Sequence, residues 1–394
     1  MGLRQVINNW ISYVRSISVV PITRRFSVNM GSTAALEVST EETLKKQTLR
    51  PQHTISHIMD SKQITGILIE HGCVDLSGEF DLKCLEDTPP CSGGGWGDII
   101  CTQMRDGTSV AVKRTNVLTR SPDFKRMIKE AARELHIWSK CDHKNVMKLM
   151  GFVELNGRFS MVSPWMEGGD VSSYIQQTPE AGAEHRLDLC KQLANGLCYF
   201  HEQGMVHGDL KAQNALVSIS KDREVVVKLT DFGSASIKHS SLSYSSLQAT
   251  MRSLFWVPPE LMRGTGTSPN FASDIYSLGM TVLEIITGEY PFSEWNQNAL
   301  MCRLAYVGPQ DAGAPLPTRP VCCIPPTNNG DQVWKLLTSC WSEISHLRPS
   351  ALNVKESLES ARLELSEIDW SHSGKPSHPV CKARSTNQAS LATV

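Results

Sequence analysis

The sequence predicts an α+β fold with a small, sheet-rich lobe near the start of the chain and a larger helical lobe after it. From about Pro90 glycines cluster, and short strand-like runs such as TSVAVKR and FSMVSPWM follow. From Leu187 to Gly204, and in most of the chain after Pro258, the pattern is helical. Strands that come first and helices that come later favour two joined lobes of this kind.

Length and composition are compatible with one large domain and two tails. The chain has 394 residues, of which 40% are hydrophobic and 20% charged, as is ordinary for a globular protein. Its formal net charge of -1 gives no overall field that would attract nucleic acid or an anionic membrane. No apolar run reaches about 18 residues, so we expect no transmembrane segment and no receptor architecture. These totals do not predict the oligomeric state.

The cysteines indicate a reduced, intracellular setting. There are 12 of them and no C-x-x-C pair, and the neighbours Cys322 and Cys323 have poor geometry for a disulfide or a zinc site. We therefore expect a cytoplasmic protein. The first 36 residues contain arginines and no acid, so a mitochondrial transit peptide is an alternative to a disordered extension.

The two ends of the chain have a different composition from its centre. Residues 37–87 are polar and mixed, with a short helix predicted near Ile55 to Ile69 from apolar residues at helical spacing. We expect residues 1–87 to form an N-terminal extension that is partly disordered. Residues 365–394, rich in Ser, Pro, Lys and His, are predicted to be a disordered tail.

A glycine-rich turn, Ser92 to Gly97, precedes the first clear strand. Glycines such as Gly94 let backbone amides approach phosphate oxygens that a Cβ would block. Lys113 ends the run VAVK 16 residues after Gly97, and a hairpin between them would return this lysine to the glycine turn. The helix predicted from Pro122 to Cys141 carries Glu134. Such a charged stretch is usually a solvated face, and the functional alternative is that Glu134 points inward and pairs with Lys113.

The run HGDLKAQNALV, from His207 to Val217, carries the strongest chemical signal. It places Asp209, Lys211 and Asn214 in one turn after a helix and before a strand. Phosphoryl transfer needs positioning and charge neutralisation more than covalent help. Asp209 would orient a substrate hydroxyl, Lys211 would stabilise charge on the transferring phosphate, and Asn214 would offer a hard oxygen to magnesium.

The run Asp231-Phe232-Gly233 follows the strand VVVKLT. A carboxylate at this strand end could bridge a metal ion to phosphates. Such a tripeptide is common by chance, but one hairpin after Asp-x-Lys-x-x-Asn it is not. We therefore predict that Asp231 and Asn214 are metal ligands.

Together and in this order, these motifs resemble those of the eukaryotic protein kinase superfamily over residues from about 88 to 364. The resemblance is carried by SGGGWG, VAVK, Glu134, HGDLKAQN, DFG, VPPE at residues 257–260, the DIYSLG run from Asp274, and Arg348. Segments such as WSKCDHKNV and VSPWM make the chain similar to the tyrosine-kinase-like serine/threonine kinases, notably the fungal ones.

The resemblance implies the two-lobed protein kinase fold, with the N-lobe at about 88–163 and the C-lobe at about 167–364. It implies transfer of the γ-phosphate of ATP, held by Mg²⁺, to serine or threonine of protein substrates, in signalling. The implied catalytic residues are Lys113, Glu134, Asp209 and Lys211.

The resemblance also implies an adenine pocket whose hinge runs from Pro164 to Met166. Pro164 would accept a hydrogen bond from the adenine amino group, and Met166 would supply the amide donor that proline lacks. Ser163 would border the space behind the purine, and Asp170 would reach the ribose. The implied nucleotide-binding residues are Ser92, Gly94, Gly97, Ile99, Ala111, Lys113, Ser163, Pro164, Met166, Asp170 and Leu216.

Two structural contacts are implied as well. Trp138, Leu149, His207 and Phe232 would stack into the spine of an active kinase. Glu260 and Arg348 would form a buried pair that braces the helical lobe.

The chain departs from the family pattern at three positions. Ser92 stands where the first glycine of the phosphate loop is usual, which could loosen the grip on the nucleotide. Gly208 stands where many kinases have an arginine that binds a phosphorylated activation loop, so switching by such a phosphate is in doubt. Arg252 replaces a usual glycine, for which we have no physical account.

Two other functions remain as alternatives. A kinase-like binding module without catalysis would be expected to lack one of the catalytic or metal-binding residues named above, and all are present. A small-molecule phosphotransferase would generally lack the VPPE segment and the platform from Ser253 to Glu260. Tyrosine specificity is disfavoured because Lys211 follows the catalytic Asp209 by two residues, as in serine/threonine kinases.

Overall fold

The computed structural model describes residues 61–70, 72–94, 97–114, 131–132, 134–155, 158–237, 251–266, 268–293, 295, 299–300 and 315–361. Several predictions fall outside these residues. They concern the N-terminal 36 residues and their targeting alternatives, the start of the helix from Pro122, most of the serine-rich segment from Ser234 to Thr250, and the tail at 365–394.

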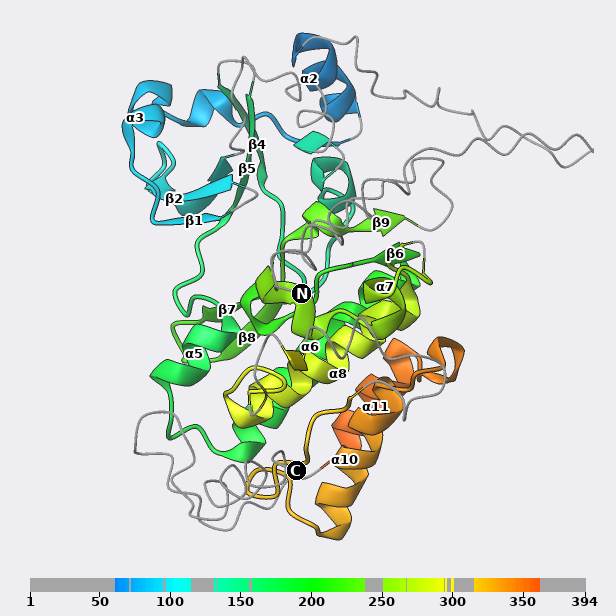
Figure 1. Ribbon diagram of the computed structural model, residues 1–394. Helices are drawn as coiled ribbons and strands as arrows, with labels where there is room; N and C mark the ends of the chain where they lie inside the picture. The colour runs from blue at the N-terminus through cyan, green and yellow to red at the C-terminus, as the bar shows by residue number, and fades with distance from the viewer. Residues whose placement is uncertain are drawn as a thin grey trace, which may run out of the picture. The chain divides into compact units, whose positions relative to one another are not determined.

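The first lobe is built on an antiparallel sheet of five strands with the order β1-β2-β3-β5-β4 (Figure 1). Their bounds are β1 (Ser92–Gly94), β2 (Gly97–Gln103), β3 (Ser109–Arg114), β4 (Gly151–Leu155) and β5 (Arg158–Pro164). The register pairs Ile100 with Val112 and Val112 with Val162, and all three side chains are buried in one core cluster. Because side chains alternate between faces, the neighbouring Lys113 points to the opposite face of the sheet.

Residues before β1 also belong to the folded unit. They form α2 (Ser61–Glu70), η1 (Ser77–Glu79) and α3 (Leu82–Asp87). Phe80 and Leu85 are buried in the same cluster as Val112 and Val162, so they cover the outer face of the sheet. The helix predicted near Ile55 to Ile69 is therefore present from Ser61, and ordered structure begins well before residue 88.

The second lobe is mainly helical. Its helices are α5 (Val171–Gln177), α6 (Ala183–Glu202), η2 (Ala212–Asn214), η3 (Phe232–Ser234), η4 (Met251–Trp256), α7 (Pro259–Met262), α8 (Phe271–Thr287), α10 (Asn328–Cys340), η5 (Ser345–Leu347) and α11 (Ala351–Ser360). Two small antiparallel ladders, β6 (Met205–Val206) with β9 (Ser236–Ile237) and β7 (Ala215–Ile219) with β8 (Val225–Leu229), frame the loops that carry the polar motifs.

α8 is the central helix of this lobe. Every residue from Ser273 to Ile286 is buried, which is the pattern of a core helix rather than a surface helix. α6 and α10 pack against it, and α11 packs on α6 and α10 (Figure 1). No helix within the described ranges is long and apolar enough to cross a membrane. The α+β fold predicted from the sequence, with a sheet lobe followed by a helical lobe, is thus confirmed.

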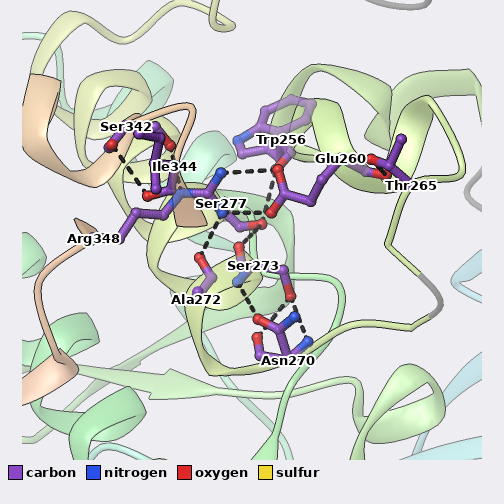
Figure 2. A network of polar contacts seen from close by, with 10 residues as sticks. All are labelled: Trp256, Glu260, Thr265, Asn270, Ala272, Ser273, Ser277, Ser342, Ile344 and Arg348. Atoms are coloured by element: carbon purple, nitrogen blue, oxygen red, sulfur yellow. Dashed lines mark hydrogen bonds and ion pairs between the residues drawn. The ribbon is translucent and has the colours of Figure 1, made fainter. Parts of the chain in front are cut away.

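The predicted Glu260–Arg348 pair is present and joins three parts of the helical lobe (Figure 2). The two guanidinium nitrogens of Arg348 donate to the two oxygens of Glu260 at 2.7 and 2.9 Å. Arg348 also donates to the carbonyls of Ala272 and Ser342 at 3.0 and 2.9 Å. One buried cation therefore ties α7 to the start of α8 and to the segment after α10.

We expect Arg348→Met to lower the free energy of unfolding by about 3–5 kcal/mol, because Glu260 would be left without its buried partner. Urea unfolding followed by circular dichroism measures this loss. Glu343→Gln is the matched control, since Glu343 is 51% exposed in its pair with Arg263 and should contribute less than about 1 kcal/mol. Equal losses in both variants would contradict a bracing role for Arg348.

Candidate active site

Lys113 lies at the centre of the site, because its ammonium group contacts two carboxylates from distant parts of the chain. Its Nζ donates to Glu134 Oε1 at 2.8 Å and to Asp231 Oδ1 at 2.7 Å. The lysine comes from β3, Glu134 from a helical stretch at 134–138, and Asp231 from the segment just after β8. The structure thus contains the predicted Lys113–Glu134 pair and adds Asp231 as a second partner.

These three charges shift one another's pKa. Burial by itself lowers the pKa of Lys113, but the fields of Glu134 and Asp231 outweigh it and raise that pKa above its ordinary value. Burial raises the pKa of Glu134, and Lys113 opposes the shift. Burial also acts to raise the pKa of Asp231, yet Lys113 holds it below the ordinary value. At neutral pH the site therefore keeps a charged ammonium group beside an ionised Asp231.

Asp209, Lys211 and Asn214 lie together in the loop between β6 and β7. Lys211 Nζ is 2.9 Å from Asp209 Oδ2. Asn214 Nδ2 donates to the same oxygen at 3.0 Å and to the Asp209 carbonyl at 2.7 Å. The Thr230 amide donates to the Asn214 carbonyl at 2.9 Å, which fixes this loop to the segment that carries Asp231.

The backbone just before Asp209 is anchored to α8 by hydrogen bonds. Asp274 accepts hydrogen bonds from the His207 and Gly208 amides at 2.8 and 2.9 Å. Gly208 has φ 82°, and an added Cβ would lie 2.8 Å from the Ser234 carbonyl oxygen. A side chain at this position would be strained, so the glycine that replaces the usual arginine suits the local backbone.

The predicted spine is assembled around Phe232. Its ring lies 5.5 Å from the Trp138 ring and 5.8 Å from the His207 ring, both edge to face. Leu149 packs against the same core cluster. Phe200 of α6 also stacks on Phe232 at 5.3 Å, a contact that the sequence did not single out. The segment after Asp231 is therefore held inward by aromatic contacts.

The strand register brings Ser92 and Ile99, on the strands that flank the glycine-rich turn, beside Lys113, as the predicted hairpin requires. Ser92 pairs with Ile99 and Gly94 with Gly97 across β1 and β2, and Ile99 pairs with Lys113 across β2 and β3.

The β3–β5 register fixes where the predicted hinge lies, because Ala111 pairs with Ser163, the residue before Pro164. Pro164 ends β5, and Met166 is buried just after it. Leu216 forms a bridge with Asp170. The nucleotide contacts of these residues stay predictions.

Asp170 has a structural role that the sequence did not predict. Its two carboxylate oxygens accept from the Ser173 amide at 2.9 Å and from the Ser173 hydroxyl at 2.7 Å. It is thus the N-cap of α5, which is a common use of aspartate. A ribose contact, which stays a prediction, would have to share these oxygens.

Asn214 and Asp231 offer the oxygen donors that Mg²⁺ prefers. Asn214 uses its amide nitrogen within the loop, which assigns its oxygen to any metal role. Asp231 has φ 64° and ψ 73°, a strained conformation for a residue with a Cβ and one that is frequent at functional sites. Among the described residues no group of three or more His, Cys, Asp or Glu could hold a metal ion. The hard oxygens of Asn214 and Asp231 fit a magnesium ion whose other ligands would come from phosphate and water.

Glu284 is a polar residue of the site that sequence reasoning missed. It is buried in α8 and accepts from the Ala212 amide at 3.2 Å, from Gln213 Nε2 at 3.2 Å and from Trp256 Nε1 at 3.1 Å. It therefore joins the loop of Asp209 to η4. The available signal was a lone acid within the apolar run MTVLEIIT.

The fold and these contacts define the class of the protein, which is that of the two-lobed kinases. Residues 93–358, more than half of the chain, match the family model described as the protein kinase domain. The chain belongs to this family, as the motifs predicted.

The curated relatives that match include kinases of both acceptor classes. The "Proto-oncogene tyrosine-protein kinase ROS" of Rattus norvegicus is 31% identical over 62% of this chain and 10% of its own length. The "Serine/threonine-protein kinase BCK1/SLK1/SSP31" of Saccharomyces cerevisiae is 30% identical over 57% of this chain and 15% of its own length. The chain thus spans only a small part of these relatives, and their names do not agree on the residue that is phosphorylated.

We expect Glu284→Gln to flatten the dependence of stability on pH. Burial raises the pKa of Glu284 to about 8 despite its three donors, so the folded state keeps a proton that the unfolded state releases above its ordinary pKa. In the wild type, titration of Glu284 therefore lowers the free energy of unfolding by about 2–4 kcal/mol as the pH rises from about 5 to 8. The glutamine cannot ionise. The free energy of unfolding of the variant should therefore rise relative to that of the wild type by the same amount over this pH range.

Urea unfolding at several pH values measures this difference. Glutamine also suits the site. Gln213 Oε1 is buried and has no hydrogen-bond partner among the described residues. After a half-turn of the Gln213 amide, the new glutamine could donate to this oxygen. Glu343→Gln controls for the loss of one negative charge. Parallel curves for the wild type and Glu284→Gln would show that Glu284 titrates at the same pH in both states.

Proposed function

We propose that this chain is a protein serine/threonine kinase that transfers the γ-phosphate of ATP, with Mg²⁺, to protein substrates in signalling. The observation that carries this proposal is the double contact of Lys113 with Glu134 and Asp231, next to the Asp209 loop. We further propose the cytoplasm as its location, with the mitochondrion as the alternative if residues 1–36 direct import.

Each residue of the site has a role in this reaction. Lys113, held by Glu134, would bind the α- and β-phosphates and align them. Asp209 would accept a hydrogen bond from the substrate hydroxyl and point it at the γ-phosphate. Lys211, already 2.9 Å from Asp209, would stabilise the negative charge that spreads over the transferring group. Bound Mg²⁺ would neutralise phosphate charge, with Asn214 and Asp231 as its protein ligands.

Serine/threonine specificity is supported by Lys211 and by the similarity to the yeast serine/threonine kinase. A serine hydroxyl is carried on a short side chain, so the substrate backbone must approach Asp209 closely. A lysine two residues after the catalytic aspartate is the serine/threonine pattern that the motifs resemble. The tyrosine kinases among the relatives make tyrosine the second candidate acceptor.

Phosphorylation of peptides that differ only in the acceptor tests this proposal. The full chain with MgATP should phosphorylate serine or threonine peptides at least about tenfold faster than tyrosine peptides. Lys113→Met should lower the rate by at least about 100-fold with the fold intact, because phosphate alignment is lost. Faster tyrosine transfer would contradict the acceptor class, and transfer unaffected by Lys113→Met would contradict the site.

The small side chain of Ser163 predicts open space behind the purine in the adenine pocket. This side chain is buried before Pro164, so the wild type should accept inhibitors with a benzyl-sized group on the adenine amino nitrogen. Ser163→Phe should exclude such compounds by overfilling while ATP turnover is retained, and inhibition curves on both proteins measure the difference. If the wild type is equally resistant, the hinge is out of register or a neighbour such as Met147 or Met161 closes the space.

A further inference from the structure

Residues 61–76 lie before the region that matches the family model, yet they contact two parts of the first lobe at once. One end packs against the helical residues that include Glu134. The other end lies along β4. This segment therefore connects the sheet, which carries Lys113, to the helix that carries the partner of Lys113.

The contact with the helix is made by one face of α2 and by the turn that ends it. Gly72 and Cys73 donate to the carbonyls of Ile69 and Leu68, both at 2.9 Å, the paired bonds of a Schellman turn. Leu68 is 1% exposed, whereas the neighbouring Ile69 is 50% exposed. The face of α2 that carries Leu68 therefore points inward, and the turn ends the helix just beyond it.

The inward side chains reach the residues beside Glu134. Leu68 and Cys73 share a core cluster with Leu135 and Trp138. Cys73 Sγ lies 3.9 Å from the Leu135 carbonyl oxygen, one residue along the chain from Glu134. This contact ties the turn after α2 to the backbone beside Glu134.

The contact with the sheet is made by backbone groups. Phe152 of β4 donates to the Val74 carbonyl at 2.9 Å, and the Leu76 amide donates to the Phe152 carbonyl at 2.8 Å. This pairing adds a short parallel bridge at the edge of β4. A Cβ at Gly151 would overlap the Val74 carbonyl oxygen, so this close approach requires glycine. The segment is consequently anchored to the sheet at a fixed distance.

Glu134 needs such support, because it is buried next to a second carboxylate. Its burial raises its pKa and so opposes ionisation, and Asp231 competes with it for the same ammonium group. Apolar contacts on the other side of the helix can hold the carboxylate at Lys113 against these costs.

We propose that residues 61–76 are a positioning element for the reaction, which holds Glu134 in contact with Lys113 from outside the region that matches the family. The residues that act are Leu68 and Cys73 on the helix side and Val74 with Gly151 on the sheet side. This inference rests on the proposed function, in which the Lys113–Glu134 pair aligns ATP.

The test compares Leu68→Ala with the matched control Ile69→Ala in the full chain. Leu68→Ala should lower kcat/KM for ATP about tenfold, whereas Ile69→Ala should change it less than about twofold. Leu68→Met, which conserves volume, should restore most of the loss. Hydrogen exchange of the amides at 134–138 should become about tenfold faster in Leu68→Ala and stay unchanged in Ile69→Ala.

A double-mutant cycle separates positioning from general stability. In a Glu134→Gln background, Leu68→Ala should lower residual kcat/KM less than about twofold, because the pair it supports is already broken. The same tenfold loss in both backgrounds, or wild-type kinetics and exchange in folded Leu68→Ala, would overturn the inference. If Leu68→Ala does not fold, Leu68→Val supplies a milder change with the same direction in every measurement.

Failure of the proposed function would look different. If Glu134→Gln transfers phosphate at the wild-type rate, the pair has no catalytic role and the proposed mechanism fails. Faster exchange at 134–138 in Leu68→Ala would still show that α2 holds the helix. If Glu134→Gln is impaired but neither exchange nor kinetics responds to Leu68→Ala, only the positioning inference fails.

Discussion

The contact of one lysine with two carboxylates is the constraint on which the rest of the structure depends. Lys113, Glu134 and Asp231 come from a strand, a helix and the end of a ladder, and all three must arrive within hydrogen-bond distance. The β1–β2–β3 register brings the strands that flank the glycine turn to the lysine. The contacts of Phe232, edge to face with Trp138 and stacked on Phe200, hold the segment after Asp231. Each of these features has a separate local cause, but they are useful only when they meet at one ammonium group.

The helical lobe supports this site through α8. This helix is mainly apolar, but it carries two acidic side chains where it contacts the loops around Asp209 and Ala212. Asp274 accepts hydrogen bonds from the His207 and Gly208 amides. Glu284 accepts from the Ala212 amide, in the loop after Lys211, and from the Trp256 indole. Buried carboxyl groups are tolerated in α8 because backbone and indole donors hydrogen-bond them. The same burial raises the pKa of Glu284. The burial that makes its hydrogen bonds to the loop necessary is thus also the cause of its shifted pKa.

Much of the site could be predicted because its parts are local. Asp209, Lys211 and Asn214 lie within six residues, and a single turn suffices to bring them together. The buried pair of Glu260 with Arg348 was also predictable, through the family resemblance. Glu284 could not be assigned a partner, because its donors lie about 30 to 70 residues away and nothing in the helix pattern indicates which loop covers it. The second role of Asp170 as a helix cap was missed because cap geometry depends on where α5 begins.

The sequence by itself determined the two-lobed α+β fold, the order of the motifs and the pairing of Lys113 with Glu134, whereas the contact of Lys113 with Asp231 came from the structure. It did so because strand and helix periods and short loop spacings are properties of neighbouring residues. The tertiary structure alone decided that residues 61–87 belong to the first lobe. Their anchors are a backbone pairing with β4, a close approach at Gly151 and apolar contacts with the Glu134 helix. None of these leaves a local pattern in the sequence, since each requires two segments that are distant along the chain to pack against each other.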